Sequence, residues 1–254
     1  MGRRNLRERF GVWLGDVAWP DVANRLDGGA VAVLPIGAGA KEHGTHIPMS
    51  ADQLQARWLA DQLTQMADIV VWPVVTYGYY PAFADYPGSI TLTAETFGRM
   101  VSEILAGILG SGAKRVLIIN TGISTIEPLT DICSRPGHRE HVRLANVYDG
   151  EQYRATAHRL RQEPRGGHAG ELETSIMLAI APESVHLYKA EPWTSERMGP
   201  GPLRRADADD ANYSPSGAYG DPTLATREKG EVLLQAMLQD LALIFDKKMG
   251  VATG

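Results

Sequence analysis

The stretch "VAVLPIGAGAKEHGTHIPMSAD", residues 31–52, joins a buried-strand pattern to a polar, glycine-rich loop. Its first six residues are apolar, and a glycine turn, Gly37-Ala38-Gly39, follows them. Short, continuously apolar runs are typical of strands that are buried on both faces of a parallel sheet. A dinucleotide-binding fold also begins with a strand and a glycine turn. The residues after the turn must therefore decide between a phosphate loop and a metal site.

The phosphate-loop interpretation fails at Glu42. In the pattern G-x-G-x-x-G the third glycine falls on Glu42, whose carboxylate would repel a pyrophosphate. Pro48 disfavours helical geometry at Ile47, so no helix opens directly after the turn. The helix is predicted to start at Ser50, with Gln53 completing an S-x-x-Q capping box. A nicotinamide or flavin oxidoreductase is thus the weakest functional hypothesis.

Histidines and carboxylates gather in two places along the chain. One is the opening stretch, with Glu42, His43, His46 and Asp52; the other is "GGHAGELETS", residues 166–175, with His168, Glu171 and Glu173. Imidazole and carboxylate are the ligands that many catalytic divalent metals take. Carboxylates are also favoured in the first turn of a helix by the helix dipole alone. The remaining histidines have mostly polar neighbours and are predicted at the surface: His138, His141, His158 and His186.

Apolar runs and helical periodicities alternate along the first part of the chain. Strands are predicted at 30–36, 69–75, 115–120 and 142–148, and helices at 52–66, 94–109, 169–180 and 227–249. This alternation indicates a layered α/β/α fold with a mostly parallel central sheet. Ligands bind at the carboxyl ends of the strands in such sheets. The unusual loops 37–51, 76–93 and 121–128 follow strand ends and are expected to form the site.

The last third of the chain and its overall composition complete the prediction. Residues 186–226 are rich in Pro, Gly, Asp and Tyr without periodicity, which is typical of a functional or subunit-packing segment. No linker divides the chain, so we expect a single domain, 1–254. A net charge of −5 gives no basic surface for nucleic acid or an anionic membrane. The lone Cys133, with no signal peptide and no membrane-length apolar run, favours a cytoplasmic protein.

Four segments in order resemble the creatininase family of metal-dependent amidohydrolases. They are "LPIG" with "KEHGTHIP" and Asp52, then "YPGSITLT" at 86–93, "HAGELETSIMLAIAP" at 168–182 and "GDPTLATREKGE" at 220–231. The resemblance covers nearly the whole chain. It implies a layered α/β fold, a homo-oligomer such as a hexamer, and hydrolysis of a C–N bond. The implied substrate is a small amide, lactam, ureide or formamide, with a peptide in one branch of the family.

The chain departs from the family pattern at two metal-binding positions. The family has E-x-H, whereas this chain has Lys41 in place of the glutamate, and Glu42 directly precedes His43. The family's third strand ends in N-G-H-G-G-N, but here the sequence is "NTGIST" and Gly122 stands at the histidine position. Glycine has no side chain that could bind a metal, so one of the two metal positions of the family is depleted.

The resemblance implies ligands for a divalent ion, zinc or manganese. His43 and Asp52 match ligand positions directly, and Glu173 is the expected third ligand. Three protein ligands and a water are a normal catalytic zinc arrangement. One ion per chain is therefore expected rather than two, because a second ion would need Glu42 or His168 to replace the missing ligands.

The same resemblance suggests roles in catalysis. His168 is expected to donate a proton to the leaving nitrogen, and Glu171 or Glu42 to act as the base. Lys41 would stabilise an oxyanion or else be a solvated lysine. Substrate contacts are predicted for Tyr79, Ser124 and Thr125. Aromatic residues of 76–89 would clamp a flat heterocycle or pack between subunits.

Two further hypotheses use the same residues differently. A non-catalytic relative would keep the fold and use the altered site for ligand binding or scaffolding. Alternatively, the metal site would serve a hydrolase or lyase that acts on a C–O or C–C bond.

Overall fold

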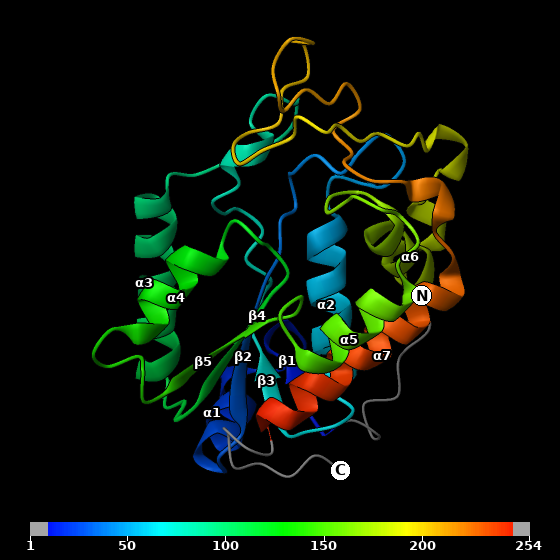
Figure 1. Cartoon of the computed structure of the whole chain (residues 1–254). Helices are drawn as coiled ribbons and strands as arrows, with labels where there is room; N and C mark the ends of the chain where they lie inside the picture. The colour runs from blue at the N-terminus through cyan, green and yellow to red at the C-terminus, as the bar shows by residue number, and fades with distance from the viewer. Residues whose placement is uncertain (1–9, 246–254) are drawn as a thin grey trace.

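The computed structural model describes residues 10–245 and contains one five-stranded parallel sheet (Figure 1). Its strand order is β1-β3-β2-β4-β5. The strands are β1 (Val12–Trp13), β2 (Val31–Ile36), β3 (Ile69–Val71), β4 (Val116–Asn120) and β5 (Val142–Asn146). β2 lies at the centre, and all six of its side chains are buried, as its apolar sequence predicts. The predicted layered α/β fold is confirmed.

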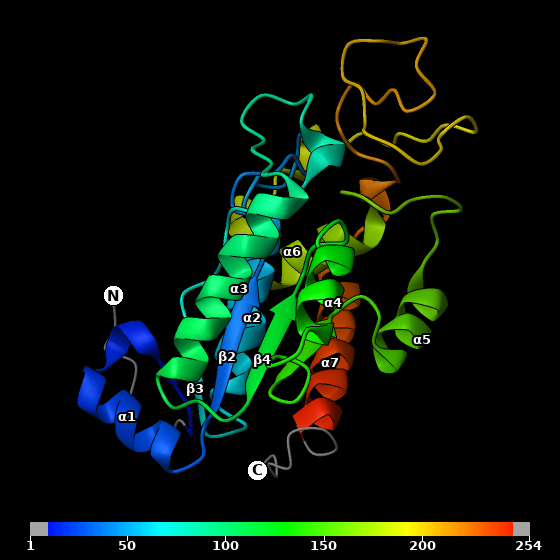
Figure 2. The ribbon, with the colours of Figure 1, turned by 90° about the vertical axis from the view of Figure 1, so that its left-hand side faces the viewer.

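Helices cover both faces of the sheet (Figures 1 and 2). One face carries α1 (Trp19–Asp27), α3 (Ala94–Gly110) and α4 (Ile126–Ser134), which share a hydrophobic core. The other carries α2 (Ala51–Leu63), α5 (Glu151–Leu160), α6 (Glu171–Ile180) and α7 (Arg227–Ile244), which share a second core. No described helix is both long enough and apolar enough to cross a bilayer.

Several element boundaries differ from the sequence-based expectation. β3 ends at Val71 rather than residue 75, because Pro73 has no N–H to donate, and Val75 forms only an isolated bridge to Ile36. β5 ends at Asn146 rather than residue 148. Helices α1, α4 and α5 were not predicted. α5 buries only Tyr153 and Ala157, too narrow an apolar stripe to recognise in sequence.

The ends of two helices also differ from the prediction. α6 begins at Glu171 rather than residue 169, because Ala169 adopts a left-handed backbone with φ of 47° that cannot belong to the helix. The described part of α7 ends at Ile244, and the predicted continuation to residue 249 lies outside the described residues.

The irregular segment 186–226 lies beyond the carboxyl ends of the strands, at the top of Figure 1. Its helical content is two short 3₁₀ turns, Leu187–Lys189 and Pro222–Leu224. Tyr219 forms an antiparallel bridge with His168, so this segment reaches the predicted site residues.

The end of β2 is packed tightly against the start of α2. A side chain at Gly37 would overlap the carbonyl oxygen of Asp52 and the hydroxyl of Thr121, which explains the glycine there. Ser50 occupies the N-cap position, but its hydroxyl makes no cap bond, so the predicted capping box is wrong. The N–H of Gln53 instead donates to the carbonyl of Ala38 at 3.1 Å. This packing fixes the loop that carries Lys41, Glu42 and His43.

Candidate metal centre

Buried charged and polar side chains converge at the carboxyl end of β2. They come from the loop after β2, the first turn of α2, and the start of α6. Within residues 10–245, potential ligand atoms of His43, His168 and Glu173 lie within 4.8 Å of one another. His43 is fully buried, His168 is 9% exposed, and Glu173 is partly exposed. The structure therefore brings together residues more than 120 positions apart in sequence.

One ring nitrogen of His43 faces a carboxylate. Its Nδ1 lies 2.9 Å from the carbonyl oxygen of Lys41, an acceptor, so Nδ1 carries the hydrogen. Its Nε2 lies 3.0 Å from Oδ1 of Asp52. Either a proton on Nε2 or a metal ion at this edge satisfies the contact between the ring and the carboxylate. Two ligands of one tetrahedral zinc ion are about 3.3 Å apart, close to the observed separation.

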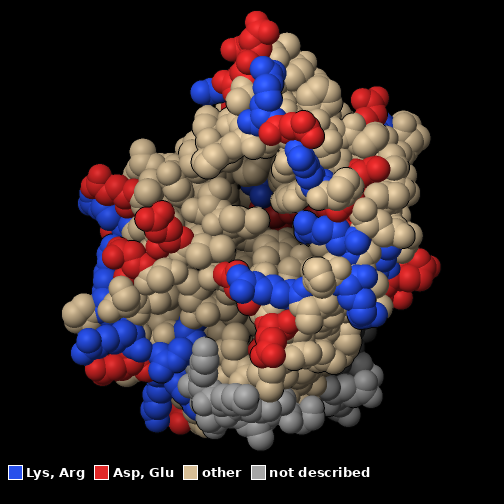
Figure 3. Space-filling model, viewed as in Figure 1, with Lys and Arg blue, Asp and Glu red and all other residues tan. Residues whose placement is uncertain are grey.

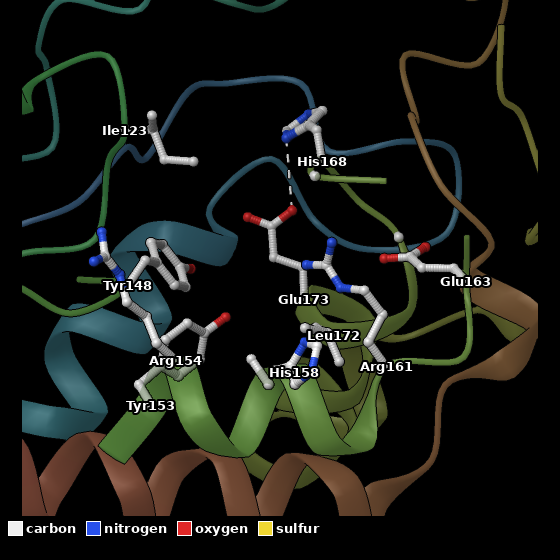
Figure 4. Close-up of a pocket in the computed structure, with 13 residues that line it drawn as sticks. Ile123, Tyr148, Tyr153, Arg154, His158, Arg161, Glu163, His168, Leu172 and Glu173 are labelled. Carbon is white, nitrogen blue, oxygen red and sulfur yellow. Dashed lines mark ion pairs between the residues drawn. The ribbon is translucent and has the colours of Figure 1, made fainter. Parts of the chain in front are cut away.

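His168 is also held through one ring nitrogen by an acceptor, but through Nε2 rather than Nδ1. Its Nε2 lies 3.0 Å from Oε2 of Glu42 and donates to that carboxylate, while Nδ1 lies 3.6 Å from Oε2 of Glu173. Figure 4 shows the latter pair as a dashed line above the cavity. A histidine held through one nitrogen by a carboxylate, with the other nitrogen free, is the usual second-shell arrangement of a metal ligand. Glu42 thus orients His168 rather than reaching the cluster itself.

Charge coupling between Glu42 and His168 opposes the effect of burial. Burial lowers the pKa of His168, but the charge and hydrogen bond of Glu42 together with the charge of Glu173 raise it, and the net pKa is above its ordinary value. Burial likewise raises the pKa of Glu42, whereas the positive charge of His168 lowers it, and the net pKa is below its ordinary value. The N–H of Gly44 also donates to Glu42. The Glu42 carboxyl group is therefore held as an anion.

Asp52 is paired with Lys41 inside the protein. The ammonium Nζ lies 2.7 Å from Oδ2 of Asp52. Burial raises the pKa of Asp52, whereas the charge of Lys41 lowers it. The net pKa of Asp52 is below its ordinary value. The same ammonium lies 4.8 Å from the ring centre of Phe83. Lys41 is thus directed at Asp52, and the sequence-based alternative of a solvated lysine is wrong.

Glu173 is aimed at the cluster by an unusual backbone. Ala169 is the one non-glycine residue with positive φ in the described chain. In this conformation its N–H donates to Oε2 of Glu173 at 2.5 Å. Strained backbone of this kind is concentrated at functional sites. The strain therefore serves to place a carboxylate beside His168.

A cavity of about 400 Å³ opens next to His168 and Glu173. Figure 3 shows a hollow at the centre of this face, with basic side chains along its edge. Figure 4 shows α5 along one side of the cavity. The walls are formed by Ile123, Tyr148, Tyr153, Arg154, Ala157, His158, Arg161, Glu163, Gly167, Gly170 and Leu172. A small organic molecule fits this space beside the cluster.

Glu171 does not face the cluster. Its carboxylate pairs with the ammonium of Lys229 and accepts the N–H groups of Gln162 and Glu163 at 2.7 and 2.8 Å. All of these contacts tie α6 to α7 and to the segment after α5. The geometry gives Glu171 a structural role and does not support the base role that the sequence suggested.

The predicted substrate contacts are also placed apart from the cluster. Thr125 is buried, with its hydroxyl 2.7 Å from Oδ1 of Asn120. Tyr79 and Ser124 line a second cavity of about 470 Å³. Ile123 borders both cavities, so these two residues are neighbours of the cluster cavity and not part of its lining.

Sequence reasoning missed the wall of the cavity that α5 supplies. Arg154, His158 and Arg161 recur at i, i+4 and i+7, and all three line the cavity. His158 is exposed, as predicted for this histidine, but it is exposed toward the cavity. The helical spacing of these basic residues is the signal that could have identified the wall.

Comparison with known proteins identifies the family. The family model described as creatinine amidohydrolase matches residues 15–245. The chain belongs to the creatininase family. It is 25% identical to creatinine amidohydrolase of Pseudomonas putida, over 91% of this chain and 95% of that protein. It is 23% identical to 3-dehydro-scyllo-inosose hydrolase of Thermotoga maritima, over 91% of this chain and 81% of that protein.

A solved structure described as creatininase with manganese shares the fold. Its TM-score is 0.77 at 24% identity, and the match covers 93% of this chain and 98% of that one. The sequence-based predictions of the creatininase family and of an enzyme are confirmed at the level of the family. Metal binding fits the donor set here, because two imidazoles and one carboxylate converge at one point.

Proposed function

We propose that the protein is a metal-dependent amidohydrolase that cleaves a C–N bond of a small molecule. One observation carries the proposal: His43 and His168 are each held through one nitrogen by an acceptor, and each directs the other nitrogen at a carboxylate. A divalent ion bound by the two rings and the carboxylate fits this arrangement. The adjoining cavity supplies room for a small substrate.

His43, His168 and Glu173 would hold the ion. Two histidines and one glutamate are a ligand set of known catalytic zinc sites, which leave a further position for water or substrate. When bound, the ion lowers the pKa of water to about 7 and polarises a carbonyl group. This set revises the sequence-based role of His168 as a proton donor, because Nδ1 of His168 faces Glu173. Asp52 as a ligand stays a prediction, since its Oδ1 lies 3.0 Å from Nε2 of His43.

Glu42 would support this ion from behind its ligand His168, and Asp52 would border it at Nε2 of His43. Glu42 fixes the ring of His168, and Asp52 borders Nε2 of His43 with one carboxylate oxygen. The other oxygen of Asp52 forms an ion pair with the ammonium of Lys41. We therefore propose one ion per chain, zinc or manganese. A cytoplasmic location, a homo-oligomer and a single domain remain predictions.

The substrate would enter through the cavity beside α5. Its walls combine apolar groups with two tyrosines, which suits the small amides, lactams, ureides and formamides expected from the family resemblance. A second candidate, hydrolysis of a carbocyclic ketone, is supported by the similarity to the 3-dehydro-scyllo-inosose hydrolase. A substrate panel separates the two.

Elemental analysis combined with a substrate panel tests the proposal. The purified protein should contain close to one zinc or manganese ion per chain and hydrolyse at least one lactam, cyclic ureide or formamide. His43→Ala should lose both the ion and the activity. His141→Ala is the matched control, because His141 is exposed and its Nδ1 lies 3.1 Å from the carbonyl of Lys114, away from the cluster. A metal-free protein that takes up neither ion, or an active His43→Ala variant, would reject the proposal.

A further inference from the structure

Helix α5 lays a row of basic side chains along one wall of the cavity. Arg154, His158 and Arg161 line it, and Figure 4 shows them on the α5 side, opposite His168. Arg154 and His158 lie one turn apart on one face of α5, and Arg161 follows directly at the C-cap position of the helix. The row therefore forms a surface directed at whatever occupies the cavity.

Arg161 is the residue of this row whose charge is available. Arg154 pairs with Asp149 at 2.7 Å on the exposed rim. Arg161, by contrast, has no ion pair with any residue in 10–245, although its charge acts on the nearby Tyr153 and Glu163. An arginine fork beside a cavity is suited to bidentate binding of an oxyanion.

The acidic groups of the cavity have other partners besides Arg161. Glu163 is 4% exposed, and its Oε2 accepts the N–H groups of Glu171 at 3.1 Å and Asp221 at 2.7 Å. The charge of Arg161 acts on Glu163, but the two form no ion pair within residues 10–245. Glu173 is a ligand in the proposed function, so the divalent ion offsets its charge. The wall at Arg161 is then the positively charged end of a cavity whose other end holds the ion.

We propose that the substrate carries a carboxylate that Arg161 binds, while its scissile amide or lactam bond lies at His168 and Glu173. This rests on the proposed function and specifies its substrate class. Apolar lining from Ile123, Ala157 and Leu172 fits the carbon chain between the two ends. Hydrolysis adds one water across the C–N bond, giving a second carboxylate and an amine, and needs no further reactant.

A matched pair of probes tests the inference by binding. Succinamic acid carries one amide and one carboxylate, whereas succinamide carries two amides and no charge. Calorimetry on the metal-loaded protein should show succinamic acid binding about 10- to 100-fold more tightly, the range for hydrogen bonds to a charged group. Arg161→Gln should remove that difference, and Arg161→Lys should restore part of it.

Arg159→Gln is the matched control, because Arg159 is an exposed arginine of the same helix that does not line the cavity. It should bind succinamic acid like the unaltered protein. Equal binding of the two probes, no binding of either, or an equal loss in the Arg159→Gln variant would overturn the inference. Inorganic phosphate that binds as tightly as succinamic acid would also overturn the preference for carboxylate.

The binding result separates this inference from the proposed function. Arg161-dependent binding without turnover of any amide would reject the hydrolase and leave the carboxylate site in place. Turnover of neutral and carboxylated amides with equal kcat/KM, unaffected by Arg161→Gln, would keep the hydrolase and overturn the carboxylate site.

Discussion

Lys41 and Asp52 form an ion pair inside the protein, with Nζ 2.7 Å from Oδ2 and side chains only 6% and 1% exposed. This contact explains the lysine of the opening sequence, because its ammonium is the counter-charge of a buried carboxylate. An ammonium group supplies permanent positive charge beside Asp52. This charge compensates Oδ2 of Asp52, whereas Oδ1 faces Nε2 of His43.

Lys41→Met should strongly destabilise the metal-free protein. Removing one partner leaves the Asp52 carboxylate buried without a counter-charge, which typically costs about 3–5 kcal/mol. Chemical denaturation at neutral pH measures this loss. Arg154→Met is the control, since its pair with Asp149 is exposed and should contribute less than about 1 kcal/mol. A Lys41→Met variant as stable as that control would contradict the role of the pair.

Glu42→Gln should weaken metal binding without abolishing it. Glutamine keeps an oxygen near Nε2 of His168 but removes the charge that orients the ring and strengthens it as a ligand. Loss of such a supporting carboxylate typically costs about 10- to 100-fold in metal affinity. Competition with a chelator measures the change.

Glu127→Gln on α4 is the control for this loss, because Glu127 is exposed and lies outside the cluster. Unchanged metal affinity in Glu42→Gln would show that Glu42 does not support the ion. Complete loss of metal would instead make Glu42 a ligand, as the sequence alone allowed.

Glu171→Gln should reduce stability and leave the metal in place. The change removes the charge that holds Lys229, in a pair where Glu171 is fully buried and Lys229 is 14% exposed. We expect a loss of about 3 kcal/mol in the free energy of unfolding. Metal per chain should stay at the unaltered value.

The exposed pair of Arg227 and Glu231 on α7 provides the control for this variant. Glu231→Gln should cost less than about 1 kcal/mol. A Glu171→Gln variant of normal stability that loses activity would reinstate Glu171 as a catalytic base.

The fold could be predicted because its central strands are continuously apolar and alternate with helical periodicities. β2 and β4 are buried on both faces, and the helices that cover them carry the expected apolar stripes. α5 escaped prediction because it packs through only Tyr153 and Ala157. Because α5 was not predicted, the cavity wall that it supplies, with Arg161, was not predicted either.

The candidate site was predicted as a set of residues rather than as a set of contacts. His43, His168 and Glu173 were all selected from the sequence, and the structure brings them together. The sequence could not show which hydrogen-bond or ion-pair partner each of these side chains takes, because the partner depends on side-chain directions between residues far apart in the sequence. The bond of His168 to Glu42 and the left-handed backbone at Ala169 are examples. Sequence spacing placed Glu171 and Glu173 on one helix but could not tell which of them faces the cluster.

His46 should make the metal-free protein sensitive to acid. Burial lowers its pKa to about 4 from an ordinary 6.5, and its Nε2 lies 2.8 Å from Oγ1 of Thr174. The folded protein therefore resists protonation that the unfolded chain accepts. The stabilising contribution of His46 is complete above about pH 6.5 and is lost as the pH falls toward about 4. This shift corresponds to about 3 kcal/mol.

His46→Gln removes the titrating group and keeps a hydrogen-bonding partner for Thr174. The free energy of unfolding of this variant should fall by about 3 kcal/mol less than that of the unaltered protein between about pH 7.5 and pH 4. Denaturant unfolding at a series of pH values measures the difference. His141→Gln should follow the unaltered protein, because His141 is exposed. If His46→Gln lost stability as steeply as the unaltered protein, the acid sensitivity would have to arise from the carboxylates, since Glu42 and Asp52 also have lowered pKa values.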